Sequence, residues 1–422
     1  MKWSNRRKAS LLNYDWITVS LYFVLAVIGI ISIYSTSFDE NQHGLLNTFY
    51  GKQSIWLLFS IIIIFSINII NLKFIKNNAS IFYLVGILLL ILVLIFGAEI
   101  NGNKSWFRFG SFSIQPAEFA KVTTALGLAG LLTEHSFGLQ NLKHIFQSFI
   151  LILTPALLIL LQPDLGSVII FFSFFIVLYR EGLNHNFFLF VFLFGFLFIS
   201  TIFFGHQAMN IIVSFLFFVS AILSYYFLKK KNFFYMLLIY IISLGMIFST
   251  NYTYKHILKP HQKNRIDIVL GKVKDDKGVG YNLKQALIAT GSGGLFGNGF
   301  MKGTQTNGNY IPEQHTDWIM SSIGEQWGFV GSFFVVVLFT GLLIRLIFLA
   351  ERQKQSFARI LGYGVIGILF FHFSLNILMV LGIFPTIGIP LPFLSYGGSS
   401  LWAFTILLFL FLKFDANRVQ DW

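Results

Sequence analysis

The stretch from Tyr14 to Tyr34, YDWITVSLYFVLAVIGIISIY, decides the class of fold. An α-helix rises about 1.5 Å per residue, so roughly 20 apolar residues cross the ~30 Å hydrocarbon core of a bilayer. A signal peptide would have a shorter apolar run and a cleavage site of small residues. The stretch therefore predicts a retained first transmembrane helix. The basic residues that precede it are Lys2, Arg6, Arg7 and Lys8.

The composition extends this interpretation to the whole chain. Hydrophobic residues make up 56% of the 422 residues and charged residues only 11%, whereas a soluble domain carries roughly 25% charged residues. A net charge of +13 is compatible with nucleic-acid binding, but the basic residues form short clusters between apolar runs, as the positive-inside rule requires. We therefore expect no nucleic-acid partner. The chain has no cysteine, which excludes disulfides, thiolate metal sites and a cysteine nucleophile.

Polar breaks divide the chain into successive apolar runs. They fall at about 36–52, 71–79, 98–115, 135–147, 181–185, 229–232, 250–316, 351–359 and 384–399. Alternate breaks carry the basic clusters, which places both termini in the cytoplasm. We predict an all-α polytopic integral membrane protein with about ten to twelve transmembrane helices, a large external loop at about 250–316, and one membrane domain over 1–422. The region 186–249 can be divided into spans in more than one way.

The first polar constellation runs from Asn101 to Lys121 and includes Lys104, Arg108 and Glu118. Pro116 suits the first turn of a helix, where its missing N–H costs nothing. Glu118 and Lys121 are three residues apart and share one face of that helix. Ionisable groups inside a membrane mark functional cavities by default, so we favour a functional pair over two charges that only neutralise each other. In Gln162–Gly166, QPDLG, we favour a helix cap for Asp164.

The long loop is basic. Its basic residues are Lys255, Lys259, Lys263, Arg265, Lys272, Lys274, Lys277, Lys284 and Lys302, against Asp267, Asp275, Asp276 and Glu313. An anionic lipid headgroup or a diphosphate substrate would explain this charge, and so would a solvated loop. The spacing within 278–290 predicts a short helix in the membrane interface. The following GSGGLFGNG, 291–299, would let backbone N–H groups approach phosphate oxygens, although a flexible connector looks similar.

Two further segments carry groups suited to chemistry. PEQHTDW, 312–318, leads into GEQWG, 324–328, which places Asp317 at the mouth of a helix and Glu325 about two turns deeper. A helix cap would explain Asp317 alone, but His315 and two acids on a basic loop favour proton transfer. The last segment, 382–400, holds too many prolines and glycines for a helix. Its Ser395 and Tyr396 offer donors to a sugar or phosphate.

In this order, the segments resemble the SEDS family of cell-wall polymerases (RodA/FtsW) over about 95–415. PEQHTD, 312–317, and LPFLSYGGSS, 391–400, are the most specific, and Gly388–Pro392 resembles the RodA branch. The chain departs from the family pattern in three places. Trp318-Ile-Met320 stands where Phe-Ile-Phe is commoner, and Ala117 stands where Ser is common. Gln326 replaces a second Glu, which puts a second acid there in doubt.

The resemblance implies a peptidoglycan glycosyltransferase that polymerises lipid II at the outer face of the bacterial cytoplasmic membrane and releases undecaprenyl diphosphate. It implies that Asp317 is the catalytic base and that Glu118 and Lys121 line the central cavity. Lys121, Lys104 or Arg108 would neutralise the diphosphate, with Lys121 preferred. The other substrate-binding candidates are His315, Glu325, Ser395 and Tyr396.

The expected partners are lipid II, a class B penicillin-binding transpeptidase and other membrane proteins of the elongation complex. No ligand cluster in the sequence requires a cofactor or a metal, although a divalent cation is compatible with the reaction. Three other functions compete with the glycosyltransferase. A lipid II flippase would also use a charged cavity, a secondary transporter would show inverted repeats, and a scaffold would not need Asp317, Glu118 and Lys121 together.

Overall fold

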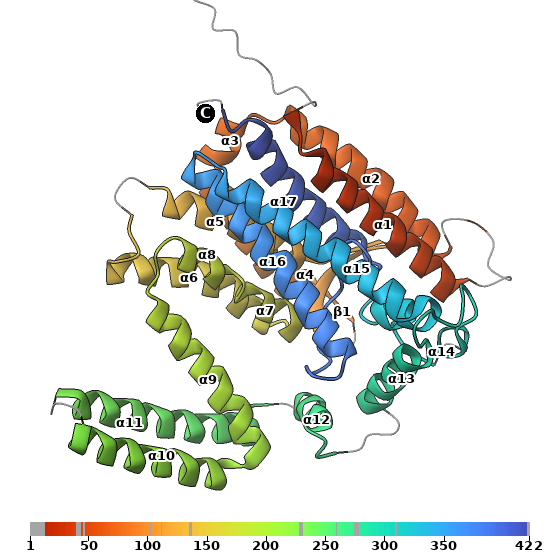
Figure 1. The fold of residues 1–422 in the computed structure, drawn as a ribbon. Coiled ribbons are helices and arrows are strands. Elements are labelled where there is room, and N and C mark those ends of the chain that lie inside the picture. Colours follow the sequence, from red (N-terminus) through yellow and green to blue (C-terminus); the bar gives the residue numbers. More distant parts are fainter. Residues whose placement is uncertain are drawn as a thin grey trace, which may run out of the picture. The chain divides into compact units, whose positions relative to one another are not determined.

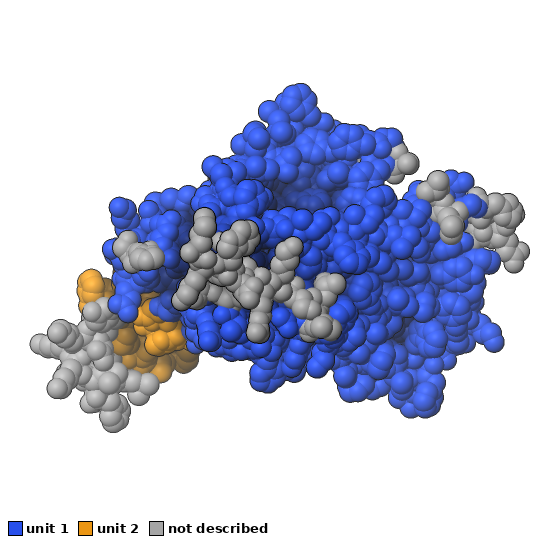
Figure 2. Space-filling model, turned by 90° about the horizontal axis from the view of Figure 1, so that it is seen from above, with its two compact units in different colours: residues 1–183, 281–422 blue, residues 184–280 orange. Residues whose placement is uncertain are grey.

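The computed structural model describes residues 13–38, 44, 47–100, 103–110, 112–134, 137–227, 231–258, 260–273, 278–308 and 310–419. The sequence predictions that lie outside these residues concern Lys2, Arg6, Arg7, Lys8, Asp39, Glu40, Asn101, Lys229, Lys230, Lys259, Lys274, Asp275, Asp276 and Lys277. Inter-residue contacts divide the chain into two compact units (Figure 2). Unit 1 is 1–183 with 281–422, and unit 2 is 184–280.

Unit 1 is a helical bundle (Figure 1). Its helices before the break are α1 (Trp16–Ser37), α2 (Phe49–Ile69), α3 (Leu72–Asn77), α4 (Ala79–Phe96), α5 (Pro116–Leu132), α6 (Leu142–Leu160), α7 (Leu165–Phe171) and α8 (Phe174–Arg180). After the break come most of α13 (Val279–Ser292), then α14 (Thr304–Asn307), α15 (Ile319–Glu351), α16 (Ser356–Val380) and α17 (Gly398–Ala416). Polar side chains start several helices: Asp15 accepts a hydrogen bond from Thr18 N at 3.0 Å, and Thr48 accepts one from Gly51 N at 3.3 Å.

Helix α5 lies at the centre of unit 1. It packs against α4, α6, α16 and α17, and most of its residues are buried. Small residues allow this close packing: a Cβ on Gly127 would lie 2.9 Å from the Tyr83 side chain, and one on Gly364 would lie 3.2 Å from Ala125. Pro116 occupies the first turn, as predicted. The pair Glu118 and Lys121 therefore sits on a largely buried helix of the bundle.

The break at 98–115 is not irregular. It forms a three-stranded antiparallel sheet in the order β1 (Ala98–Ile100), β2 (Asn103–Phe109), β3 (Phe112–Ile114). The predicted all-α architecture holds for the rest of the described residues, and this short sheet is an addition that was not predicted. Phe112 packs against Trp402 of α17, with ring centroids 5.3 Å apart.

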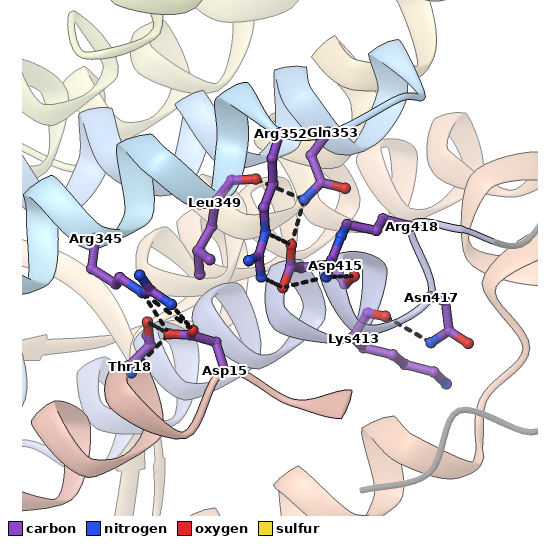
Figure 3. Close-up of polar contacts among 10 residues, drawn as sticks. All are labelled: Asp15, Thr18, Arg345, Leu349, Arg352, Gln353, Lys413, Asp415, Asn417 and Arg418. Atoms are coloured by element: carbon purple, nitrogen blue, oxygen red, sulfur yellow. Dashed lines mark hydrogen bonds and ion pairs between the residues drawn. The ribbon is translucent and has the colours of Figure 1, made fainter. Parts of the chain in front are cut away.

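Basic side chains from several helices meet acidic partners at one end of unit 1, part of which Figure 3 shows. Arg345 pairs with Asp15, and Arg352 pairs with Asp415, whose side chain is fully buried. Further pairs join Arg180 to Glu351 and Arg359 to Glu181. Lys413 donates to the Ile67 carbonyl at 2.7 Å. These contacts tie the ends of α1, α2, α8, α15, α16 and α17 together.

The predicted outer segments meet at the opposite end of unit 1. Gln314 donates from Nε2 to the Thr36 carbonyl at 2.7 Å, and Gln53 donates to the Ser395 carbonyl at 3.3 Å. Ser399 donates to the Ser113 carbonyl at 3.1 Å. The alternation of basic and polar breaks read from the sequence is therefore reproduced in the bundle.

Helix α15 is broken at Gly328, whose φ of 66° and ψ of −159° are not helical. The glycine-rich stretch 291–299 packs its backbone into this break: Phe329 N donates to the Gly294 carbonyl at 2.9 Å, and Asn298 N donates to the Glu325 carbonyl at 2.9 Å. A Cβ on Gly297 would lie 2.1 Å from the Gln326 carbonyl oxygen. The glycines permit close approach to a helix rather than to a ligand, which corrects the phosphate-binding interpretation of this stretch.

Unit 2 consists of helical segments. They are α9 (His185–Phe204), α10 (His206–Phe227), α11 (Lys231–Tyr252), the π-helical turn η2 (Thr253–Ile257) and α12 (Pro260–Val269). The three long helices pack on one another around Leu197, Met209, Met246 and Ile247. Because η2 continues α11, the long loop begins after Ile257 rather than near 250. Helix α13 confirms the short helix predicted over 278–290.

Within the described residues, nine helices are long and apolar enough to cross a membrane. Two shorter apolar segments, Leu165–Arg180 and His206–Ser220, and the charged helix α5 are candidates for the further spans that the sequence predicted. The chain is a multi-pass membrane protein.

Candidate functional site

Glu118 and Lys121 form a buried ion pair on α5. Lys121 Nζ lies 2.8 Å from Glu118 Oε1, and the two side chains are 1% and 4% exposed. Glu118 Oε2 is also buried and has no hydrogen-bond partner. The ammonium lies 5.4 Å from the centre of the Phe404 ring of α17. Burying two charges costs several kcal/mol unless they are well paired. Each charge therefore depends on the other, and removing one would leave the other buried without a counter-ion.

A third polar side chain, His372 of α16, completes this cluster. Its Nε2 lies 2.8 Å from Lys121 Nζ, and its Nδ1 lies 3.2 Å from the Pro390 carbonyl oxygen. The sequence analysis did not single out His372. The available signal was a histidine inside an apolar helix, with Asn376 one turn further along.

Asp317 lies next to the segment that contains Pro390. Asn376 Nδ2 donates to the Asp317 carbonyl at 2.9 Å and to the Ile389 carbonyl at 2.7 Å. Asp317 is half-buried, and a Cβ on Gly388 would lie 3.3 Å from its Oδ2. Gly388 has a φ of 72°, which favours glycine. Asp317 thus lies beside residues 388–390, and Lys121, far from it in sequence, is linked to the same residues through His372.

Ser395 ties the Asp317 loop to the last segment. Its hydroxyl donates to the Thr316 carbonyl at 2.6 Å and accepts from Leu391 N at 2.8 Å. Because the hydroxyl hydrogen is already used, the structure gives Ser395 a role in holding the residue next to Asp317.

His315 and Tyr396 pack together with Phe49 of α2. Tyr396 N donates to the His315 carbonyl at 2.8 Å, and the His315 ring stacks on Phe49 with centroids 4.2 Å apart. Burial lowers the pKa of His315, against the opposing charge of Glu313. Burial raises the pKa of Tyr396 to about 12. Both side chains are therefore neutral near pH 7, and they present ring faces and edges beside the Asp317 loop.

Glu325 has a different environment from the one predicted. Its buried carboxylate accepts hydrogen bonds from Gln305 N at 2.7 Å and Thr306 N at 2.9 Å, and also from the Thr306 hydroxyl. A Cβ on Gly303 would lie 2.5 Å from Glu325 Oε2. These contacts cap α14, so Glu325 stabilises the loop before Asp317.

Lys104 and Arg108 are both exposed on β2. The sheet is anchored near the start of α17, where Gln115 N donates to Ser399 Oγ at 3.1 Å. Asp164 caps α7 through Ser167 N at 3.1 Å and also accepts from Gln115 Nε2 at 2.8 Å. The structural interpretation of Asp164 is confirmed.

Among the described residues, no group of three or more His, Asp or Glu side chains is arranged to hold a metal ion.

The fold and site define a polytopic membrane protein with a buried ion pair and a loop carboxylate at one end of a helical bundle. The model of the FtsW, RodA and SpoVE family, described as cell cycle protein, matches residues 14–216 and 207–420. The chain belongs to this family.

Two relatives illustrate the similarity in sequence. The peptidoglycan glycosyltransferase RodA of Treponema pallidum is 31% identical, covering 96% of this chain and 98% of that protein. The peptidoglycan glycosyltransferase MrdB of Escherichia coli K12 is 31% identical over 76% of this chain and 72% of its own length.

Solved structures share the fold. One comes from a study of how a peptidoglycan synthase complex coordinates polymerization and crosslinking; it has a TM-score of 0.72 and 27% identity and covers 97% of this chain and 99% of its own. The rod shape determining protein RodA of Thermus thermophilus has a TM-score of 0.63 and 25% identity, with the same coverage of 97% and 99%.

Proposed function

We propose that this chain is a peptidoglycan glycosyltransferase that polymerises lipid II at the outer face of the bacterial cytoplasmic membrane, for cell-wall elongation and cell shape. The names of its relatives in Treponema pallidum and Escherichia coli support the activity. The observation that carries the proposal is a pair of bridges to one segment: His372 links Lys121 to Pro390, and Asn376 links the Asp317 backbone to Ile389. The proposed base Asp317 and the cation Lys121 are thereby both connected to residues 388–390.

In the proposed reaction, Asp317 accepts the proton of the acceptor 4-hydroxyl. The hydroxyl oxygen bonds to the anomeric carbon of the donor as the bond to the diphosphate breaks, so the configuration inverts and undecaprenyl diphosphate leaves. General base catalysis of this kind contributes about 10²–10⁴-fold to the rate.

Lys121 supplies the positive charge for the leaving diphosphate. An ammonium has three donors, and the hydrogen bonds to Glu118 and His372 use two of them. The third N–H is left to donate a hydrogen bond to a phosphate oxygen. Because a cation in a water-excluded site is worth far more than one in water, a single such contact suffices for a large effect.

The proposal includes a partner and an orientation. The chain would work with a class B penicillin-binding transpeptidase and other membrane proteins of the elongation complex, with both termini in the cytoplasm. Two observations support this: a similar fold occurs in a peptidoglycan synthase complex, and the basic residues gather at one end of unit 1.

The test is polymerisation of lipid II by the purified chain, with and without its transpeptidase. Asp317→Asn should lower turnover by about 10²–10⁴-fold. Glu313→Gln is the matched control, since it makes the same acid-to-amide change at an exposed position of the same loop, and it should retain turnover. Equal turnover of the two variants would remove Asp317 as the base.

The same preparations distinguish a flippase. Movement of lipid II across vesicles without any glycan polymer, under every partner condition, would replace the glycosyltransferase by a translocator. Repeating the polymerisation with EDTA tests the divalent cation: unchanged turnover would exclude a required metal.

A further inference from the structure

Helix α16 carries two buried polar side chains one turn apart, His372 and Asn376, which are 2% and 0% exposed. Polar groups buried in a membrane helix are costly, and they persist where they serve a specific arrangement. Neither residue is assigned a role in the reaction proposed above.

The bonding of His372 fixes its protonation. A lysine ammonium only donates hydrogen bonds, so His372 Nε2 must accept from Lys121 Nζ at 2.8 Å. The proton of the neutral ring then sits on Nδ1, which donates to the Pro390 carbonyl at 3.2 Å. The ring edge also contacts Phe404, with centroids 4.9 Å apart. His372 therefore holds Lys121 at a set distance from Pro390.

Asn376 makes the corresponding connection to the base. Its Nδ2 donates both hydrogens, to the carbonyls of Asp317 at 2.9 Å and of Ile389 at 2.7 Å. Ile389 and Pro390 are consecutive, so the two side chains hold adjacent residues of one segment. Helix α16 thus fixes Lys121 and the Asp317 backbone against the same short stretch.

We infer that His372 and Asn376 are positioning residues for glycosyl transfer, which set the place of the Lys121 ammonium relative to the Asp317 carboxylate. This inference rests on the proposed function. The base acts on the acceptor and the cation on the leaving group, on opposite sides of one anomeric carbon. A displacement of about 1 Å in such a geometry can cost about 10²-fold in rate.

Two substitutions at His372 separate its two hydrogen bonds. In His372→Gln the amide reaches the place of Nε2 and can accept from Lys121, whereas in His372→Asn it reaches only the place of Nδ1 and can donate to Pro390. We expect His372→Asn to lower kcat by about 10–100-fold, the range for a lost hydrogen bond to a charged group, with KM changed less than about threefold. His372→Gln should retain kcat within about fivefold of wild type.

Phe370→Leu is the matched control on the same helix, because Phe370 is 45% exposed and lies two residues from His372. It should leave kcat and KM unchanged. Thermal unfolding of each variant in detergent gives the folded fraction by which kcat is corrected. Asn376→Leu, corrected in the same way, should lower kcat at unchanged KM; an unchanged kcat would remove Asn376 from the proposal.

A double-mutant cycle tests whether His372 acts through Lys121. In a Lys121→Gln background, His372→Asn should cost less than about threefold, because the group it positions is already gone. The same loss in both backgrounds, or equal kcat for His372→Gln and His372→Asn, would overturn the inference. If Lys121→Gln has no measurable turnover, the inference is tested by the comparison of kcat between His372→Gln and His372→Asn alone. Absence of polymer from the wild type would instead refute the proposed function.

Discussion

Gly328 is the residue at which the structure predicts a large effect from a single methyl group. Its φ of 66° and ψ of −159° are accessible almost only to glycine, and forcing another residue into such a region costs about 1–3 kcal/mol. A Cβ there would also lie 2.3 Å from Gly297 N and 2.6 Å from the Leu295 carbonyl oxygen. Both are backbone atoms, so neither can move away cheaply.

Relieving these contacts in Gly328→Ala would separate α15 from the glycine-rich stretch. The hydrogen bonds at risk run from Phe329 N to the Gly294 carbonyl and from Val330 N to the Leu295 carbonyl, at 2.9 and 3.1 Å. Each is worth about 0.5–1.5 kcal/mol. Together with the backbone strain, we expect a loss of about 3–5 kcal/mol in the free energy of unfolding. At roughly 2 °C per kcal/mol for a chain of several hundred residues, the thermal midpoint should fall by at least about 5 °C.

The assay is thermal unfolding of the purified protein in detergent, followed by tryptophan fluorescence. Gly341→Ala is the control on the same helix, since a Cβ at Gly341 meets no atom within 4 Å. Alanine there should be neutral or stabilising by about 0.5–1 kcal/mol, because glycine is unfavourable inside a helix. Equal thermal midpoints for the two variants would refute the argument from the break in α15.

Three further predictions concern single carboxylates. Burial raises the pKa of Asp15, but hydrogen bonds from Arg345 and Thr18 outweigh it and lower the pKa to about 2. Because this is below the unfolded value of about 3.9, the carboxylate stabilises the fold above about pH 4, and that stabilisation is lost as the pH falls from about 4 to about 2. Asp15→Asn should therefore show a flatter acid fall in thermal midpoint than wild type; parallel curves would contradict this. Glu325→Gln should turn an amide N–H₂ toward the backbone donors of α14 and so make residues 299–313 more sensitive to limited proteolysis. The KM for lipid II is the second measurement. A raised KM with unchanged proteolysis would favour substrate binding by Glu325 instead. Asp164→Ala should cost about 1 kcal/mol through loss of the α7 cap, measured as thermal midpoint, while Asp164→Asn retains most of it; a loss of turnover without a loss of stability would argue for a catalytic Asp164.

The sequence alone was enough to predict which polar breaks lie at which end of the helical bundle. Apolar runs of membrane-spanning length must form helices, because unpaired backbone groups are too costly in lipid. The basic breaks then fall on alternate ends, and Arg352 and Arg359 meet acidic partners at one of them. Glu118 and Lys121 were singled out because ionisable residues inside a membrane helix are rare. Asp317 was singled out by its motif and by the family resemblance.

The tertiary structure decided which groups meet, since hydrogen bonds between distant segments leave no local pattern in a sequence. His372 and Asn376 became significant only when α16 was placed between α5 and residues 388–390. Glu325 looked like a second acid of the site until packing turned it toward α14. The sequence by itself determined a membrane bundle and its charged groups, whereas burial and partner choice depend on packing and were settled only by the fold.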